Sequence, residues 1–227
     1  LDRLEEVEQS DARALVVTGS GGSFSAGGDV NAMSERMAGE VSLAESVRHI
    51  HQDTSRAIER VAKFHLPTIA KVDGVAFGAG ANLALACDIQ LASAEARMIF
   101  GFRQVGLAGD TGTSYFLPRI VGLNKAKELV FTGELLDAEA AGELGLFNHV
   151  YEEEFEAQVE EFVARIAEGP TVALETSKRA LNQGMEQSLD QAMTREAAHQ
   201  AAVFETHDHQ EGAEAFMGKR DPEFEGH

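Results

Sequence analysis

A glycine-spaced corner is the feature of this sequence most able to bring main-chain N–H groups up to a ligand. Within residues 72–88, Gly78-Ala79-Gly80 lies between an apolar, β-branched run and an apolar helical stretch. Glycine has no Cβ, so it permits a sharp turn and the close approach of another group. The first N–H groups of the following helix have no partner inside the helix and point at whatever lies in front of it. The corner therefore suits an oxyanion.

A second glycine-rich loop, residues 19–29, follows a short apolar run and leads into a helix-like segment. This loop matches neither the dinucleotide-binding fingerprint nor the nucleophile elbow. The third glycine of a dinucleotide fingerprint would fall at Phe24. A nucleophile elbow has the pattern G-x-S-x-G. Ser23 has no glycine two residues after it, and Ser25 has no glycine two residues before it. Neither a dinucleotide site nor a serine nucleophile is predicted here.

Asp110 opens the string DTGTS, residues 110–114, which is similar to the active-site loop of aspartic proteases. Those enzymes need two such loops, because two carboxylates must share one proton. This chain carries the string once, and the pattern around it is helical rather than all-β. An aspartic protease is therefore not predicted.

Strands alternating with helices would position these residues. Continuous apolar runs typical of buried strands occur at residues 14–18, 68–72, 89–92, 97–100 and 146–150. Helical periodicity occurs at residues 1–9, 42–64, 114–121, 124–132 and 137–143. Only helical patterns follow, at residues 152–168, 171–182, 188–206 and 210–217. This order predicts an α/β core of right-handed crossovers over residues 1–150. A helical region over residues 151–227 would cover the site or a neighbouring subunit.

The charge balance excludes several classes of partner. Nineteen basic residues against 38 acidic ones give a formal net charge of −19, which repels nucleic acid and anionic membranes. A surface of this kind is typical of high-salt environments, so we hypothesise a halophilic source. The single cysteine, Cys87, lies in an apolar stretch and is expected to be a buried, reduced thiol. With no signal peptide and no membrane span in the pattern, we expect a cytoplasmic protein.

The two glycine-rich loops together resemble those of the crotonase, or enoyl-CoA hydratase/isomerase, superfamily. The resemblance joins residues 25–29 to residues 73–80 and to Cys87-Asp88, and it continues through Phe100-Gly101, Leu117-Pro118-Arg119 and Thr132-Gly133 to Lys219-Arg220. It implies an α/β spiral of ββα units that binds an acyl-CoA thioester. It also implies that the thioester oxygen lies between the main-chain N–H groups of Gly28 and Ala79. Such donors stabilise an enolate oxygen more in the transition state than in the ground state.

The residues expected to transfer protons differ from those of ordinary hydratases in the family. The resemblance places Asn82 and Gln104 where hydratases carry two glutamates, and an amide neither takes up nor releases a proton at neutral pH. Family isomerases carry one carboxylate in a loop that is similar to residues 106–112, where this chain has Asp110. One carboxylate suffices to lift a proton from one carbon and return it at another. Asp110 could instead cap the helix expected from residue 114 or pin a turn, and Asn82 could be a polar helix-start residue.

Coenzyme A is expected as part of the substrate, with no separate cofactor and no metal. By the resemblance, the main chain at Ala26, Asp29 and Val30 receives the adenine, and Lys219 meets the phosphates. Family members carry a further segment before the first helix of this chain, so an N-terminal part of the core is expected to be missing. The resemblance also implies homotrimers or pairs of trimers, with amphipathic C-terminal helices at the interface.

Three activities follow from these residues. The first is isomerase-like double-bond migration with Asp110 as acid and base. The second is a hydratase in which Asn82 and Gln104 replace the two glutamates and water is activated in another way. The third is a catalytically weak acyl-CoA-binding subunit that keeps the oxyanion corner while Asp110 is structural.

Overall fold

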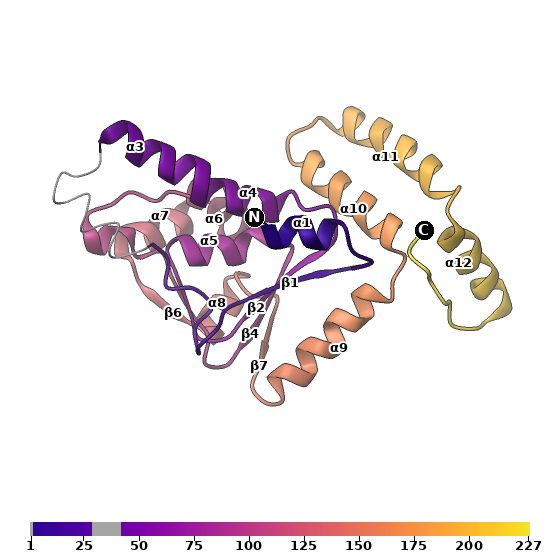
Figure 1. The fold of residues 1–227 in the computed structure, drawn as a ribbon, viewed down its shortest axis with the longest axis horizontal. Helices are drawn as coiled ribbons and strands as arrows, with labels where there is room; N and C mark the ends of the chain where they lie inside the picture. The colour runs from indigo at the N-terminus through magenta and orange to yellow at the C-terminus, as the bar shows by residue number, and fades with distance from the viewer. Residues whose placement is uncertain (1, 29–41) are drawn as a thin grey trace. The chain divides into compact units, whose positions relative to one another are not determined.

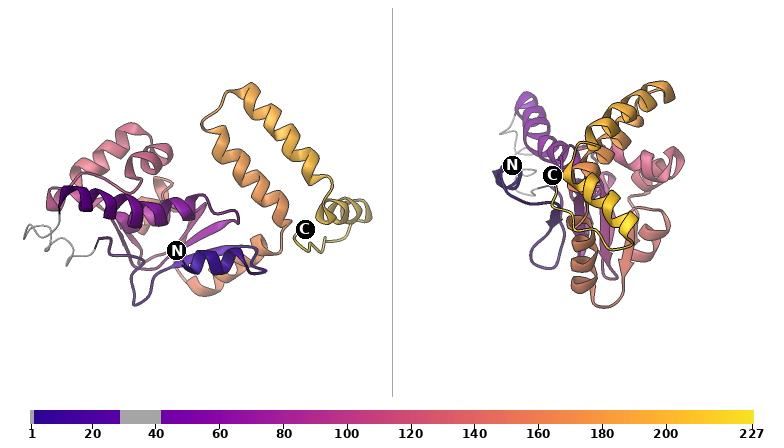
Figure 2. Two further views of the ribbon diagram at one scale, coloured as in Figure 1. Left: turned by 45° about the horizontal axis from the view of Figure 1, so that its top comes forward. Right: turned by 90° about the vertical axis from the view of Figure 1, so that its right-hand side faces the viewer.

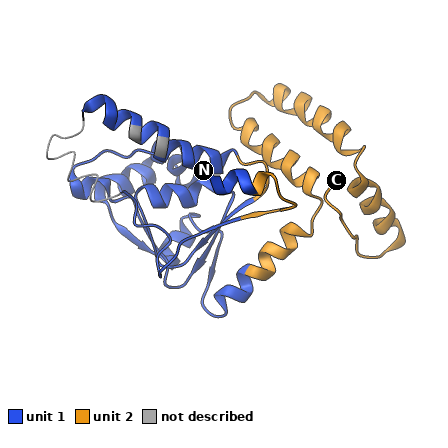
Figure 3. Cartoon of the chain, in the orientation of Figure 1, with its two compact units in different colours: residues 1–6, 16–63, 68–159 blue, residues 7–15, 64–67, 160–227 orange. Residues whose placement is uncertain are grey.

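The computed structural model describes residues 2–28 and 42–227 (Figure 1). The chain divides into two compact units (Figure 3). Unit 1 takes in Leu1–Glu6, Val16–Lys63 and Thr68–Val159, and unit 2 takes in Val7–Leu15, Phe64–Pro67 and Glu160–His227. The bounds predicted from the sequence, 1–150 and 151–227, stay a prediction.

Two sheets form the framework of the α/β part. The first has the order β1-β2-β4-β7, and its strands are Leu15–Thr18, Thr68–Val72, Ile89–Ser93 and His149–Tyr151. The second has the order β3-β5-β6, with strands Val75–Phe77, Arg97–Ile99 and Leu135–Asp137. Strand β2 pairs in parallel with β4, and β3 pairs in parallel with β5, so consecutive strands of one sheet are joined through the other sheet.

This connectivity is a spiral in which each turn of chain gives one strand to each sheet and then a helix. Strands β2 and β3 are followed by α5 (Ala79–Ala86), and β4 and β5 are followed by α6 (Thr113–Val121) and α7 (Leu123–Thr132). The first turn is abbreviated: β1 enters the first sheet, and Ser25 forms a single parallel bridge to Ala76 of β3. The predicted α/β spiral of ββα units is confirmed.

The core of unit 1 lies around β2, β4 and α5. Strand β2 is almost wholly buried, as is typical of a parallel strand covered on both faces. Helix α5 is built largely from alanine and glycine, so it is apolar on nearly every side and packs closely within the core. Asp88 ties the ends of β2 and β4 together, since one of its carboxylate oxygens accepts from the main-chain N–H (2.7 Å) and the hydroxyl (2.8 Å) of Thr68.

Some predicted elements differ from the structure. The long helix expected over residues 42–64 consists of α3 (Leu43–Arg48), a π-helical segment (His49–Ser55) and α4 (Arg56–Ala62). The wider turn changes which residues face inward, and Ile58 and Val61 of α4 are buried while Leu43 is exposed. The last strand lies at His149–Tyr151 rather than at residues 146–150. Strands β3 and β6 were not predicted, because β3 lies within the glycine-rich corner and β6 runs directly into α8.

The remaining elements of the α/β part are short helices. They are α1 (Asp2–Glu8), the 3₁₀ helix Gly101–Val105 and α8 (Ala138–Glu143). Helix α8 begins where the sequence predicts, because Asp137 caps it by accepting from the N–H of Ala140 at 2.9 Å. The 3₁₀ helix leads from β5 into the Asp110 loop.

The predicted run of helices after residue 152 is confirmed. The helices are α9 (Phe155–Ala167), α10 (Thr171–Gly184), α11 (Leu189–Val203) and α12 (His207–Gly218). Helices α10 and α11 lie side by side as a hairpin, and Ser188 with Gln191 forms a capping box at the start of α11 (Figure 2). Within the described residues, no helix has both the length and the hydropathy that crossing a bilayer requires.

An ion pair fixes the last segment of unit 2. The guanidinium of Arg220 makes two hydrogen bonds to the carboxylate of Glu211, and this lowers the pKa of Glu211 to about 2. The same carboxylate accepts from the N–H of Glu223 at 2.8 Å. The chain after α12 is therefore folded back along this helix.

Candidate active site

The two glycine-rich loops lie in direct contact. The N–H of Ser25 donates to Val75 O, and the N–H of Phe77 donates to Ser25 O, each at 2.9 Å. A Cβ at Gly27 would lie 2.6 Å from Phe77 O, and a Cβ at Gly80 would lie 2.6 Å from the Ser25 Cβ. Both distances are shorter than any real contact, so this packing requires glycine at both positions.

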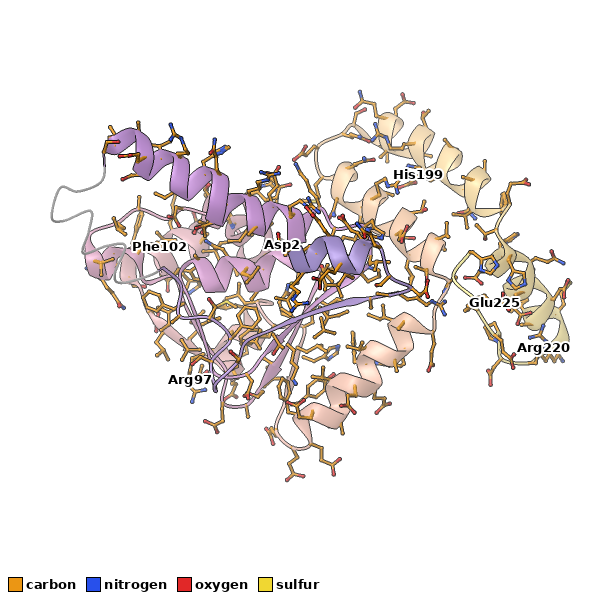
Figure 4. All side chains as sticks on the ribbon, in the orientation of Figure 1. Asp2, Arg97, Phe102, His199, Arg220 and Glu225 are labelled. Carbon is orange, nitrogen blue, oxygen red and sulfur yellow. The ribbon has the colours of Figure 1, made fainter. Side chains whose placement is uncertain are left out.

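Gly78 sets the start of helix α5 and exposes its first N–H group. Its φ of 54° is accessible mainly to glycine, and its N–H donates to Ile99 O at 2.8 Å. Helix α5 begins at Ala79, whose N–H is therefore one of those without a partner inside the helix. Ala79 is half-buried, and Gly28 is exposed on the neighbouring loop. A Cβ at Gly78 would lie 3.6 Å from the ring of Phe102, so this ring lies close to the corner (Phe102 is labelled in Figure 4).

Asn82 connects this corner to the Asp110 loop. Its side chain is wholly buried, one turn into α5, and its N–H donates to Gly78 O at 3.1 Å. Its Nδ2 group donates to Asp110 O (2.9 Å), Thr111 Oγ1 (3.0 Å) and Thr113 Oγ1 (2.8 Å). Two residues that are 28 positions apart in the chain thus meet.

The alternative in which the Asp110 side chain caps helix α6 is wrong. The N-cap of α6 is Gly112, with no side-chain capping bond, and the N–H of Thr113 donates to the main-chain oxygen of Asp110. The carboxylate of Asp110 instead accepts from the hydroxyl of Thr111 at 3.0 Å. Asp110 is half-buried, and the other structural alternative, that it pins a turn, stays a prediction.

Two threonines of this cluster were missed in the sequence analysis. Thr111 and Thr113 are buried and bond both to Asn82 and to Asp110. Thr111 also has a positive φ of 47°, which is rare and strained for a β-branched residue. The signal that could have found them is the DTGTS string itself, in which hydroxyls follow a carboxylate at close spacing.

The other predicted residues are either exposed or outside the described residues. Gln104 is exposed, and its Nε2 donates to Gly133 O at 3.2 Å, at the end of α7. Ala26 is exposed on the first glycine-rich loop. Lys219 is exposed at the end of α12, in unit 2. Asp29 and Val30 lie outside the described residues.

Comparison with known proteins agrees with this geometry. The model of the enoyl-CoA hydratase/isomerase family matches residues 1–227. The 1,2-epoxyphenylacetyl-CoA isomerase of Escherichia coli is 37% identical over 226 residues, which are 98% of this chain and 85% of that protein. The crotonyl-CoA hydratase of Syntrophomonas wolfei is 39% identical over 215 residues, 92% of this chain and 79% of that protein.

Solved structures share the fold as well. An enoyl-CoA hydratase/isomerase from Cupriavidus metallidurans superposes with a TM-score of 0.89 at 38% identity. The match covers 99% of this chain and 84% of the other. The chain therefore belongs to the enoyl-CoA hydratase/isomerase family, and it is an enzyme of the crotonase superfamily.

Proposed function

We propose that the protein is an acyl-CoA isomerase that moves a carbon–carbon double bond, with Asp110 as its single acid and base. The observation that supports this most is the set of hydrogen bonds from Asn82 to the Asp110 loop. These bonds attach the one carboxylate loop to the helix that begins at the oxyanion corner. The proposed acid–base group and the proposed oxyanion donor are thereby held in fixed positions relative to each other, which an enolate mechanism requires.

In the proposed reaction, the thioester oxygen accepts hydrogen bonds from the N–H groups of Gly28 and Ala79. The Asp110 carboxylate removes a proton from one carbon of the acyl chain, and the electron pair moves onto the thioester oxygen. The resulting dienolate takes the same proton back at another carbon, which leaves the double bond shifted and Asp110 ionised again. The donors act on charge that exists only as the reaction proceeds, so they accelerate it.

Two observations argue against hydration by two glutamates. Asn82 and Gln104 stand at the expected glutamate positions, and neither amide titrates near neutral pH. Asn82 already donates to three oxygens of the Asp110 loop, and Gln104 donates to the end of α7. Neither residue has the chemistry of a general base.

A hydratase remains the second candidate, and one observation favours it. The Oδ1 atom of Asn82 is buried and has no hydrogen-bond partner among the described residues. Such an oxygen can accept a hydrogen bond from a water molecule. Relatives named as hydratases are as similar to this chain as the isomerase is. In this case Asp110 would be the only group able to take the proton of the water.

One experiment separates the three candidates. The protein and its Asp110→Asn variant are incubated with 2-enoyl-CoA and 3-enoyl-CoA in deuterated water, and the products are followed by mass spectrometry. Double-bond migration that is lost in the variant supports the isomerase, whereas added water supports the hydratase. Retained CoA-thioester binding with no reaction in either protein supports a binding subunit.

The remaining parts of the proposal concern coenzyme A and assembly. Coenzyme A enters as part of the substrate, with its adenine on the main chain at Ala26, Asp29 and Val30 and its phosphates near Lys219. We propose trimers or pairs of trimers in the cytoplasm. Large apolar side chains exposed on the C-terminal helices support assembly through these helices; they include Leu181, Leu189, Met193, Phe216 and Met217.

The acidic surface predicts dependence on salt. The net charge of −19 means that acidic side chains repel one another. Salt screens this repulsion and so weakens it. We expect the apparent melting temperature to rise by at least about 5 °C between 0.1 M and 2 M KCl, followed by circular dichroism. Equimolar sucrose steps serve as a control for general solute effects. A melting temperature that is indifferent to KCl would contradict the halophilic hypothesis.

A further inference from the structure

A chain of two hydrogen bonds runs from the helix of the oxyanion corner to the Asp110 carboxylate. The Nδ2 of Asn82 donates to Thr111 Oγ1 at 3.0 Å, and Thr111 Oγ1 donates to Asp110 Oδ1 at 3.0 Å. A threonine hydroxyl has a single proton. The Nδ2 group of Asn82 can only donate, so the Thr111 hydroxyl accepts from it and directs its own proton at the Asp110 carboxylate. Both hydrogen bonds therefore run in the same donor-to-acceptor direction, from the buried amide of Asn82 to the carboxylate of Asp110.

Thr111 makes its hydrogen bond to Asp110 from a backbone conformation that threonine disfavours. Its φ of 47° lies in the left-handed region, where a β-branched side chain is strained. Glycine or asparagine would adopt this turn more easily. Its side chain is also buried, in a cluster with Asn82 and Thr113. Packing and hydrogen bonds thus hold a hydroxyl at a position where the backbone alone would favour another residue.

We propose that Thr111 is a positioning residue that orients the Asp110 carboxylate toward the substrate. This inference rests on the proposed function of Asp110. The bond from Thr111 holds one carboxylate oxygen, so the carboxylate cannot rotate freely and its other oxygen is presented to the acyl carbons. Asn82 acts through Thr111, since its amide fixes the direction of the hydroxyl. The role belongs to the catalytic step and not to binding of coenzyme A.

The test compares the Thr111→Val, Thr111→Ser and Thr194→Val variants of the full chain. Thr111→Val keeps the branched shape and removes the hydroxyl, and we expect kcat to fall about tenfold with KM nearly unchanged. Thr111→Ser keeps the hydroxyl, and we expect it to restore most of the loss. Thr194→Val is the matched control, because its hydroxyl also donates a hydrogen bond, to the main-chain oxygen of Asp190 (2.8 Å), and it is not part of the Asn82–Asp110 cluster. Its kcat should remain close to that of the unaltered protein.

The outcomes separate this inference from the function on which it rests. Wild-type kcat in Thr111→Val, or a loss of kcat in Thr111→Ser as large as that in Thr111→Val, would overturn the positioning role. If Asp110→Asn abolishes isomerisation while Thr111→Val does not affect it, only the inference fails. If Asp110→Asn keeps full isomerisation, the proposed function fails. Melting temperatures of all variants show which losses come from unfolding.

A separate observation in unit 2 carries a second inference. The side chains of His207, Glu225 and His227 each present a ligand atom, and these atoms all lie within 4.8 Å of one another. Glu225 is labelled in Figure 4. The imidazoles of His207 and His227 are nearly parallel, with ring centroids 5.2 Å apart. Two imidazole nitrogens and one carboxylate form a donor set that suits zinc and similar divalent transition metals.

The segment that carries two of these ligands is fixed in place. Asp208 is buried, and its carboxylate accepts from the N–H groups of Glu225 (2.7 Å) and Gly226 (2.9 Å). The N–H of Asp208 donates to His227 O at 3.0 Å, which completes the attachment. Arg13 holds the preceding residue, since its Nη1 donates to Phe224 O at 3.0 Å. The three ligands are therefore brought together before any ion binds, which lowers the entropic cost of binding.

We infer that His207, Glu225 and His227 form a surface site for a divalent transition metal, with water completing the coordination shell. The ion would cross-link the start of α12 to the chain that follows it. Asp208, beside His207, adds negative charge close to the site: its Oδ1 lies 3.8 Å from the Nδ1 of that imidazole. Because all three ligand residues are exposed, the site is open to exchange with solution.

Calorimetric titration of the full chain with Zn²⁺ and with Mg²⁺ tests this site. We expect one Zn²⁺ per chain, binding at least about tenfold more weakly in His207→Gln and in His227→Gln. His209→Gln is the control, because His209 is an exposed imidazole on the same helix that is not part of the donor set. Zn²⁺ binding that is unchanged in both variants, or no stronger than Mg²⁺ binding, would overturn the site.

Discussion

Replacement of Asp110 by asparagine is expected to lower the rate of double-bond migration at least about a thousandfold. General acid–base groups contribute about a hundred- to ten-thousandfold, and Asp110 is proposed to serve as both acid and base. Asparagine has the same shape and can still accept from the Thr111 hydroxyl, so the loop should keep its structure. The rate is measured with a 3-enoyl-CoA substrate by absorbance or by deuterium exchange.

The matched control for this variant is Asp137→Asn. Asp137 is also a carboxylate of the α/β part, but it caps α8 and bonds to the N–H of Ala140. Asparagine is an equally good cap, so both activity and stability should remain near those of the unaltered protein. Binding of coenzyme A thioesters by the Asp110 variant should be retained. Isomerisation at a normal rate in Asp110→Asn would remove this residue from the proposed role.

Replacement of Ala79 by proline is expected to lower kcat at least about a hundredfold, which is the typical loss of one oxyanion donor. Proline has no N–H, so one of the two proposed donors disappears. Ala79 is the first residue of α5, and this is the helix position that accepts proline best. The fold should therefore survive, and circular dichroism can verify this.

Ala79→Gly is the control at the same position, because it retains the N–H and adds no atoms. It should keep most of the activity. Gly28→Pro with Gly28→Ala as its control applies the same test to the other donor, on the exposed loop. Near-normal turnover in a folded proline variant would show that the N–H of that residue does not hold the substrate oxygen.

The strands of the first sheet were predictable because their sequences are continuous and apolar. Residues 68–72 and 89–92 have few alternatives to a buried strand, and the structure places β2 and β4 there. Strands β3 and β6 were missed because each is a short segment between a turn and a helix, and their pairing is decided by distant parts of the chain. The π-helical turn at His49–Ser55 is likewise invisible in a pattern of period 3.6.

The site residues remain predictions, and the contacts among them could not be predicted from the sequence. The resemblance indicated Ala79, Asn82 and Asp110, yet nothing in the local sequence says which of them touch. The three hydrogen bonds of Asn82 to the Asp110 loop depend on how β4 and β5 return the chain to α5. The role of Thr111 depends on a single backbone angle that its residue type disfavours. Such features come from tertiary packing, which overrides local preference.

The close contact between the two glycine-rich loops also has a consequence for folding. Gly27 lies against Phe77, and Gly80 lies against Ser25, so each half of the corner is shaped by the other. The two segments are distant in the chain, so bringing them together costs conformational entropy before their contacts can stabilise the corner. The corner can therefore form only when the first two turns of the spiral have come together. Activity would then report complete assembly of these turns, because a partly folded chain has no place for the substrate oxygen.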